Sequence, residues 1–345
     1  MQKPSLTPTT DDARNWFRGF LMGAADIIPG VSGGTVALIL GIYHRLVTAI
    51  SHIDSQSLDL LRKRELTSAA ERVDLRFLFG LGVGILSGVV LLAGVMHTLL
   101  IDHTCLTYAC FFGLIFASCW LVAVSVTEWN IKRYSILCFG VLGMFLVVSQ
   151  NQVETPPDSL LYTFCCGAVA ICAMILPGIS GAFILLLLGK YAEITGLIKA
   201  IPKLEATPEE IWMVAVFCAG CLVGLLSFCR LLKKLLANHE QTTLALLCGL
   251  MIGSLNKLWP FKEDLTPNEM ELKYKQYENV SLSEVTNQEI LSALLVASIA
   301  FAAVLMLDRW SRGSQQLAEV GTVTADSAEK PASNPASDES PLEKS

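Results

Sequence analysis

Long apolar runs separated by short polar segments dominate this chain of 345 residues. A hydrocarbon core about 30 Å thick requires about 20 residues of helix. We expect six runs to cross a membrane: residues 77–101, 106–127, 136–149, 211–236, 243–259 and 290–307. The third is short, so its helix is expected to begin near Tyr134. This pattern excludes soluble folds and predicts an all-α polytopic membrane protein.

Two further apolar runs are each interrupted by a proline–glycine pair. Residues 16–50 are broken at Pro29 and Gly30, and residues 160–191 are broken at Pro177 and Gly178. Proline removes a backbone donor, and glycine is a poor helix former. An interrupted helix inside lipid is tolerated only where it is buried in protein or lines a wet cavity. Each run therefore predicts a re-entrant broken-helix hairpin, which enters and leaves the membrane through one face.

The two halves of the chain repeat each other. The motif PGVSG at residues 29–33 matches PGISG at residues 177–181, and the match extends to Tyr43 and Tyr191. Small residues then recur in the same order in both halves: Gly80 and Gly84 with Gly220 and Gly224, and Gly113 and Ser118 with Gly249 and Ser254. Such self-similarity indicates an internal duplication. The predicted organisation is an N-terminal segment (1–15), a first membrane repeat (16–150), a second membrane repeat (151–312) and a disordered tail (313–345).

The number of spans sets the relative orientation of the repeats. A hairpin returns to its own side, so the three spans that follow it place the second repeat upside down, as in many secondary transporters with inverted-topology repeats. Basic residues concentrate in the segments that this arrangement places in the cytoplasm: Arg45, Arg62, Lys63, Arg64, Arg72, Arg76, Lys132, Arg133, Arg230, Lys233 and Lys234. We therefore expect a bacterial inner-membrane protein with both termini in the cytoplasm. The predicted periplasmic stretch 260–288 allows a short amphipathic helix.

Composition excludes several classes of function. Hydrophobic residues make up 53% of the chain and charged residues 16%, against roughly 25% charged in soluble domains. Nearly all of the 11 cysteines lie in apolar runs without histidine partners, so they are expected to pack as small hydrophobes and no metal site is predicted. The chain has no P-loop, and its polar first 15 residues do not resemble a cleavable signal peptide. No cofactor, nucleic-acid partner or enzymatic activity is expected.

The two proline–glycine turns form the candidate binding site. Each turn opens the second half-helix of its hairpin, where unpaired N–H groups and the positive end of the helix dipole favour an anion such as phosphate. The candidate phosphate ligands are Gly30, Ser32, Gly33, Gly34, Thr35, Gly178, Ser180 and Gly181, with Pro29 and Pro177 as the helix breaks. The alternative is that both turns are packing elements, in which serine caps a helix and glycine permits close helix contact.

Charged residues near the hairpins each allow two interpretations. Asp26 is the deepest acidic residue of the first hairpin, and Met174 stands at the equivalent position of the second. An intramembrane carboxylate often marks a coupling or relay site, but Asp26 also fits a cap or an ion pair with Arg18. Arg18, Arg45 and Arg230 lie at hairpin or span ends, where they either attract a phosphate head group or anchor the topology.

Two motifs resemble the signatures of the bacterial polyprenyl-phosphate transporter family. The first is GAADIIPGVSGGT at residues 23–35, followed by LGIY at 40–43; the second is AMILPGISG at residues 173–181, followed by LGKY at 188–191. The resemblance implies a protein that returns undecaprenyl phosphate, the carrier lipid of peptidoglycan and other envelope glycans, to the inner leaflet. It implies a head-group site at the motif positions Asp26, Gly30, Ser32, Gly33, Thr35, Gly178, Ser180 and Gly181. Phe183 in place of the polar Thr35 makes that site asymmetric.

Other functions stay open from the residues alone. These are an ion-coupled transporter or channel for a small inorganic anion, a lipid-phosphate phosphatase and a non-transporting assembly scaffold. A phosphatase would need a histidine nucleophile or a metal site, and the few histidines are scattered without a supporting basic cluster. The sequence GVSGG at residues 30–34 fits G-x-S-x-G, but that motif requires a strand-to-helix elbow, which an all-α protein lacks.

Overall fold

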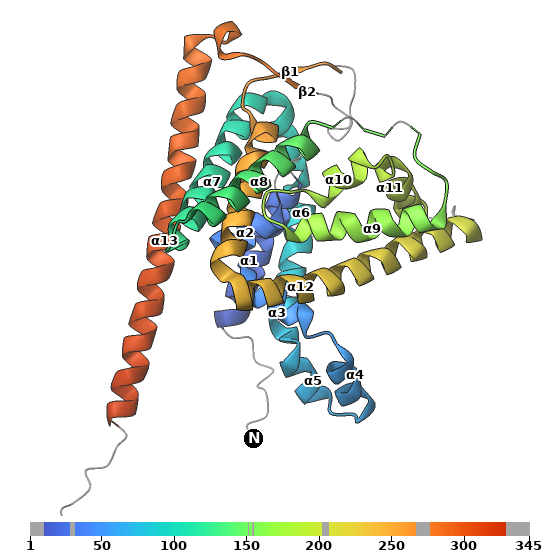
Figure 1. The fold of residues 1–345 in the computed structure, drawn as a ribbon, viewed down its shortest axis with the longest axis vertical. Coiled ribbons are helices and arrows are strands. Elements are labelled where there is room, and N and C mark those ends of the chain that lie inside the picture. Colours follow the sequence, from blue (N-terminus) through green and yellow to red (C-terminus); the bar gives the residue numbers. More distant parts are fainter. Residues whose placement is uncertain are drawn as a thin grey trace, which may run out of the picture. The chain divides into compact units, whose positions relative to one another are not determined.

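The computed structural model describes residues 10–27, 32–150, 152–153, 155–201, 207–266 and 277–328 (Figure 1). Its contacts divide the chain into two units, Met1–Val304 and Leu305–Ser345. The helices are α1 (Thr10–Asp26), α2 (Gly33–Ile39), α3 (Tyr43–Ser51), α4 (Ser55–Arg62), α5 (Leu66–Arg72), α6 (Leu75–Asp102), α7 (Thr104–Ser125), α8 (Ile131–Val148), α9 (Leu160–Ile175), α10 (Gly181–Leu187), α11 (Tyr191–Ala200), α12 (Pro208–Ser254) and α13 (Asn287–Ala328). Short 3₁₀ turns, η2 (Leu255–Leu258) and η3 (Leu282–Glu284), flank the strands β1 (Lys262–Asp264) and β2 (Tyr277–Asn279).

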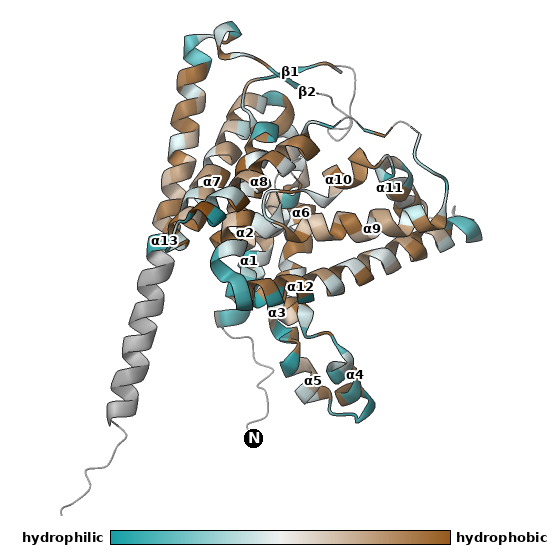
Figure 2. Ribbon diagram, viewed as in Figure 1, coloured by the Kyte–Doolittle hydropathy of each residue, from teal (hydrophilic) through white to brown (hydrophobic). Residues whose placement is uncertain are grey.

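Five helices in the described part of the chain are long and apolar enough to cross a membrane: α6, α7, α8, α12 and α13. The number rises to seven when the bent pairs α2–α3 and α10–α11 are each counted as one span. Figure 2 shows hydrophobic residues along these helices and more hydrophilic residues on α4 and α5. The prediction of a mostly helical, multi-pass membrane protein is confirmed.

Two pairs of short helices bend in the same way. The α2–α3 pair and the α10–α11 pair are each bent by 119°. A glycine lies at each elbow, with φ of 67° at Gly41 and 73° at Gly189, in the left-handed region that residues with a Cβ rarely adopt. Upstream of each elbow, α1 and α2 are separate helices, and so are α9 and α10, as the proline–glycine pairs predict.

Glycines allow α1 to pack closely along α6. A Cβ at Gly84 would clash with the backbone carbonyl of Trp16, and a Cβ at Gly88 would clash with that of Phe20. Because both partners advance by one helical turn together, the two helices run parallel. Small residues at such a contact let the two backbones approach closely, which is the usual basis of helix association in membranes.

The second repeat has the same contact. Two glycines of α12 face carbonyls of α9, Gly220 that of Phe164 and Gly224 that of Ala168. When the PGVSG and PGISG motifs are aligned, Phe164 and Ala168 match Trp16 and Phe20, which α6 faces. Gly220 and Gly224 therefore correspond to Gly84 and Gly88. The predicted pairing of Gly80 with Gly220 is therefore wrong by one helical turn. Glycines recur at every fourth residue of this part of α6, so the sequence fits two registers and only the helix contact selects one.

A helix corner at a histidine also occurs in both repeats. His103 (φ −133°, ψ 43°) separates α6 from α7, and His239 (φ −140°, ψ 44°) kinks α12 sharply, as Figure 1 shows. Four residues later a buried threonine donates to the histidine carbonyl, at 2.8 Å for Thr107 Oγ1 and 2.9 Å for Thr243 Oγ1. The predicted spans 211–236 and 243–259 are thus two arms of one kinked helix.

The repeats exchange their third helices. Gly113 of α7 lies against the carbonyl of Ala297 in α13, and its counterpart Gly249 of α12 lies against the carbonyl of Leu137 in α8. In each case a glycine of one repeat closes a contact with the last helix of the other. Gly113 and Gly249 thus have similar packing roles, and helices from both halves of the chain pack together within Met1–Val304.

Two segments differ from expectation. The described part of the stretch 260–288 forms an antiparallel pair of strands with Lys262 opposite Asn279, not an amphipathic helix. The Trp259 indole fixes this pair to the end of α12 by donating to the Val280 carbonyl at 3.0 Å.

The predicted disordered tail is also corrected in part. Helix α13 continues to Ala328, so residues 313–328 are helical. Residues 329–345 lie outside the described residues.

Candidate functional site

The described ends of the two breaks contact each other directly. The Ser32 hydroxyl donates to the Met174 carbonyl at 3.0 Å and lies 3.4 Å from the Leu176 carbonyl. The Gly178 N–H donates to Thr35 Oγ1 at 2.7 Å. Side chains near the first break therefore supply hydrogen-bond partners for backbone groups at the second break, where the interrupted helix cannot supply them. We call this contact the seam.

A tyrosine that the sequence analysis did not place in the site completes the seam. The Tyr43 hydroxyl donates to the Ile175 carbonyl at 3.2 Å, and Tyr43 is buried. The only sequence feature that pointed to Tyr43 was its match with Tyr191 at the end of the two similar motifs. Ser32 and Thr35 are 0% and 1% exposed, so the seam is closed in this structure.

Asp26 occupies the place at the first break where an external anion was predicted. Its Oδ1 accepts from the Gly33 N–H, the first amide of α2, at 2.6 Å. The next amide, Gly34 N–H, donates to Ser32 Oγ at 3.0 Å. No ion pair joins Asp26 to Arg18, both of which are described; the Arg18 guanidinium donates to Asn15 Oδ1 at 3.3 Å. The first turn thus supplies its own carboxylate to its amides.

The second break is held by close packing as well as by the seam. Gly178 has a φ of 86°, and a Cβ there would lie 2.9 Å from Ser254 Oγ. A Cβ at Gly181 would lie 2.6 Å from the Ala170 carbonyl. Ser180 caps α10 through its Oγ, which accepts from the Phe183 N–H at 3.5 Å. Gly178, Gly181 and Ser180 therefore fit the packing interpretation of the second break.

Some predicted residues fall outside this description. Pro29 and Gly30 lie outside the described residues, whereas Pro177 lies in the described turn between α9 and α10. The structure therefore brings Ser32, Thr35 and Gly178 into one seam and places Asp26 beside it.

The candidate head-group arginines are engaged in protein contacts. Arg45 makes two hydrogen bonds to the Asp74 carboxylate, at 2.6 and 3.2 Å, and its guanidinium lies 4.2 Å from the Phe77 ring centroid. Arg230 donates to the Ile53 carbonyl at 2.7 Å. Both therefore fit the anchoring interpretation in this structure.

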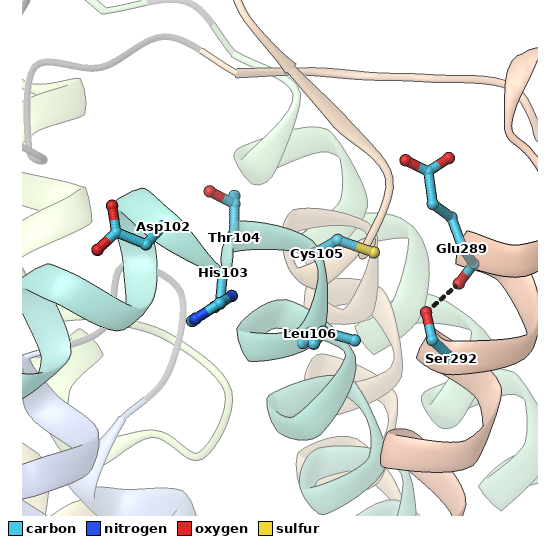
Figure 3. A pocket seen from close by; sticks show the side chains of 7 residues that line it. All are labelled: Asp102, His103, Thr104, Cys105, Leu106, Glu289 and Ser292. Atoms are coloured by element: carbon cyan, nitrogen blue, oxygen red, sulfur yellow. Dashed lines mark hydrogen bonds between the residues drawn. The ribbon is translucent and has the colours of Figure 1, made fainter.

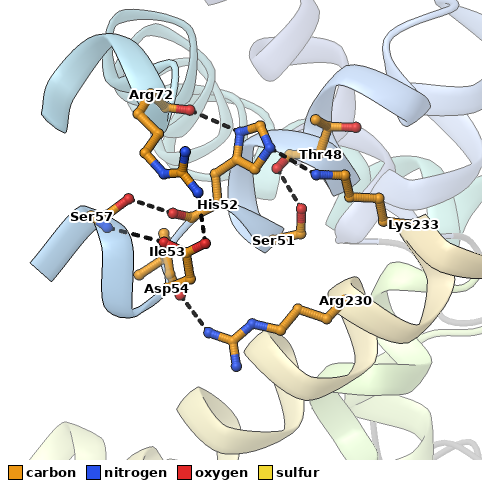
Figure 4. Close-up of polar contacts among 9 residues, drawn as sticks. All are labelled: Thr48, Ser51, His52, Ile53, Asp54, Ser57, Arg72, Arg230 and Lys233. Atoms are coloured by element: carbon orange, nitrogen blue, oxygen red, sulfur yellow. Dashed lines mark hydrogen bonds and ion pairs between the residues drawn. The ribbon is translucent and has the colours of Figure 1, made fainter. Parts of the chain in front are cut away.

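Arg230 belongs to a polar cluster that joins α12 to the α3–α4 corner (Figure 4). His52 lies between the Arg72 carbonyl, 2.9 Å from Nδ1, and Lys233 Nζ, 2.7 Å from Nε2. Because ammonium only donates, Nε2 is the acceptor and Nδ1 carries the proton. The Arg72 guanidinium hydrogen-bonds Asp54 at 2.8 Å and lowers the pKa of Asp54 to about 2. Sequence reasoning did not identify the His52–Lys233 contact, because the two residues are far apart in the chain.

A hollow of about 270 Å³ lies at the α6–α7 corner, away from the seam (Figure 3). It is lined by Asp102, His103, Thr104, Cys105, Leu106, Glu289 and Ser292. Figure 3 shows the carboxylates of Asp102 and Glu289 at its two ends. Two carboxylates disfavour an anion, so this hollow does not suit phosphate. Among the residues with described placement, no cluster of three His, Cys, Asp or Glu side chains is arranged to hold a metal ion.

Comparison with known proteins assigns the chain to a family. The family model described as undecaprenyl phosphate translocase-like matches residues 22–274, which include both breaks. The chain belongs to the undecaprenyl phosphate translocase-like family. A relative in Vibrio cholerae serotype O1 named polyprenyl-phosphate transporter is 34% identical over 304 residues, 86% of this chain and 96% of the relative.

A second relative in Staphylococcus aureus, also named polyprenyl-phosphate transporter, is 31% identical over 257 residues, 71% of this chain and 86% of the relative. No solved structure matches the chain. The predicted family resemblance is confirmed, and the relatives in this family are named as transporters.

Proposed function

We propose that this chain translocates undecaprenyl phosphate or a related polyprenyl phosphate across the bacterial inner membrane, and so recycles the carrier lipid of envelope glycan synthesis. Membership of the translocase-like family and the relatives named polyprenyl-phosphate transporter support this function. The observation that carries the proposal within the molecule is the seam, where Thr35 and Ser32 of one hairpin bond the unwound backbone of the other.

The proposed architecture is a pair of inverted repeats, each with a re-entrant hairpin and three spans. Equal bends of 119° in the two hairpins and the repeated corners at His103 and His239 support the duplication. Three spans between the hairpins make the repeats antiparallel, so the breaks approach the midplane from opposite faces. Both termini are then cytoplasmic, in accord with the basic residues of the loops between spans.

The proposed site uses the groups that now close the seam. Separation of the breaks would release the hydroxyls of Ser32 and Thr35 and the Gly178 N–H, which suit the oxygens of a phosphate monoester. Displacement of the Asp26 carboxylate would release the Gly33 N–H in the same way. The polyprenyl chain stays in lipid throughout, so only the head group needs a polar path.

The test compares lipid and inorganic anion transport by the purified protein. Vesicles that contain the protein are expected to exchange undecaprenyl phosphate between leaflets, and inorganic phosphate or chloride at millimolar concentration should not compete. Ser32→Ala should reduce the exchange rate at least tenfold. Ser125→Ala, which removes an exposed hydroxyl bonded to the Leu121 carbonyl, is the control. Flux of inorganic anions without any polyprenyl lipid would instead support the alternative, a small-anion transporter or channel.

A further inference from the structure

Two lysines meet just after the C-terminal end of α12. Lys257 lies in η2, and its Nζ is 4.7 Å from the ring centroid of Phe183. Lys262 opens β1, and its Nζ is 4.7 Å from the ring centroid of Tyr108. Both side chains are half-buried, and Tyr108 is buried. Aromatic faces attract ammonium groups but do not neutralise their charge.

No carboxylate within the described residues forms an ion pair with either lysine. Lys262 Nζ donates to the Lys257 carbonyl at 3.0 Å and lies 3.4 Å from Asn279 Oδ1, both of which are neutral. By contrast, the buried Lys190 lies 2.6 Å from the Glu193 carboxylate. Burial of an uncompensated charge is costly, so these two cations favour an anion, and none of the described carboxylates supplies it.

The described acidic residues closest to Lys262 in the sequence do not contact it. Glu263 lies on the opposite, exposed face of β1 and is paired in register with Glu278 of β2. The Asp264 carboxylate accepts from the Thr266 N–H at 2.9 Å. Burial, followed by the charge of Lys257, lowers the pKa of Lys262 to about 7. A bound anion would stabilise the protonated form of Lys262.

The position of the lysines connects them to the second break. Phe183, under Lys257, lies in the first turn of α10, three residues after Ser180. Gly178 packs against Met251 and Ser254 of α12, within two turns of Lys257 along the same chain. The two breaks therefore differ in charge, because a carboxylate, Asp26, stands at the first and an ammonium, Lys257, stands beside the second.

We propose that Lys257 and Lys262 form a docking site for a phosphate monoester head group beside the second break, where a polyprenyl phosphate arrives before it reaches the seam. The inference rests on the proposed function for the identity of the ligand. A phosphate monoester carries between one and two negative charges near neutral pH, and so attracts Lys257 and the protonated form of Lys262. In the proposed topology this site faces the periplasm, the side from which the lipid is recovered.

Binding of farnesyl phosphate to the full-length protein in detergent tests the site. Lys257→Gln and Lys262→Gln are each expected to weaken binding at least tenfold, and the control Lys234→Gln, which removes an exposed lysine of α12, should leave it unchanged. Lys257→Arg and Lys262→Arg keep the charge and should retain binding within about threefold, which separates loss of charge from loss of folding. Unchanged binding in both glutamine variants overturns the proposal.

A second arm identifies the source of the phosphate. Inorganic phosphate should bind at least tenfold more weakly than farnesyl phosphate, and equal affinity that is lost in both glutamine variants would overturn the lipid assignment. Leaflet exchange of undecaprenyl phosphate by the wild-type protein is measured in parallel. Absence of exchange by the wild type refutes the proposed function, whereas normal exchange and binding in both variants refutes only the docking site.

Discussion

Replacement of Thr35 by valine removes the acceptor that holds the second break while keeping the side-chain shape. Thr35 is 1% exposed, and its Oγ1 accepts from the Gly178 N–H at 2.7 Å. Loss of a partner for a buried N–H costs about 1–3 kcal/mol. Because that cost falls on the closed seam, the population with separated breaks should rise about 5- to 150-fold.

Hydrogen exchange of the peptide that spans residues 174–184 measures this change. The Thr35→Val protein in detergent is expected to exchange these amides faster than wild type by that factor, and peptides from α7 should be unaffected. Thr163→Val is the matched control: Thr163 is also 1% exposed, but its hydroxyl donates to the Ser159 carbonyl, which already accepts from a helical amide. Equal exchange in Thr35→Val, Thr163→Val and wild type would refute the seam as a stabilising contact.

Three further predictions follow from other contacts. Asp26→Asn should bind farnesyl phosphate several-fold more tightly, because a neutral amide competes less for the Gly33 N–H; weaker or unchanged affinity in the same titration would contradict this. Lys262 has a pKa lowered to about 7, so its positive charge is present below that pH and lost above it. Farnesyl phosphate binding should accordingly weaken from about pH 6.5 to about pH 8.5 in the wild type and not in Lys262→Arg, and parallel profiles would argue against the site. Gly84→Leu should destabilise the fold by about 1–3 kcal/mol or more in denaturant titrations, whereas Gly82→Leu, with open space around it, should not.

The sequence predicts those features that a local rule determines. Proline–glycine pairs interrupt helices wherever they occur, so both breaks follow from Pro29 and Pro177. Hydropathy places the apolar spans approximately, but it does not show that residues 211–236 and 243–254 belong to one helix kinked at His239. The corners at His103 and His239 were not predicted, although HTCLTYA and HEQTTLA share the pattern His-x-x-x-Thr-x-Ala.

Features that depend on contacts between distant parts of the chain could not be predicted from local sequence patterns. The register of α6 against α1 is ambiguous in a helix with glycine at 80, 84 and 88, and only contact with Trp16 resolves it. The use of Thr35 and Ser32 as partners for the other repeat requires knowledge of which backbone groups the second break exposes. The cluster of Lys257 and Lys262 arises because η2 and β1 fold back on Tyr108, which hydropathy does not reveal.

In the proposed function, the phosphate head group passes between the two breaks. Photo-crosslinking with a farnesyl phosphate that carries a diazirine on its first isoprene unit tests this most directly, with labelled residues located by mass spectrometry. Labelling is expected in residues 26–35 and 177–183, and excess undecaprenyl phosphate should abolish it. Labelling confined to the outer surface of the spans, with both breaks unlabelled, would show that the head group does not pass between the breaks.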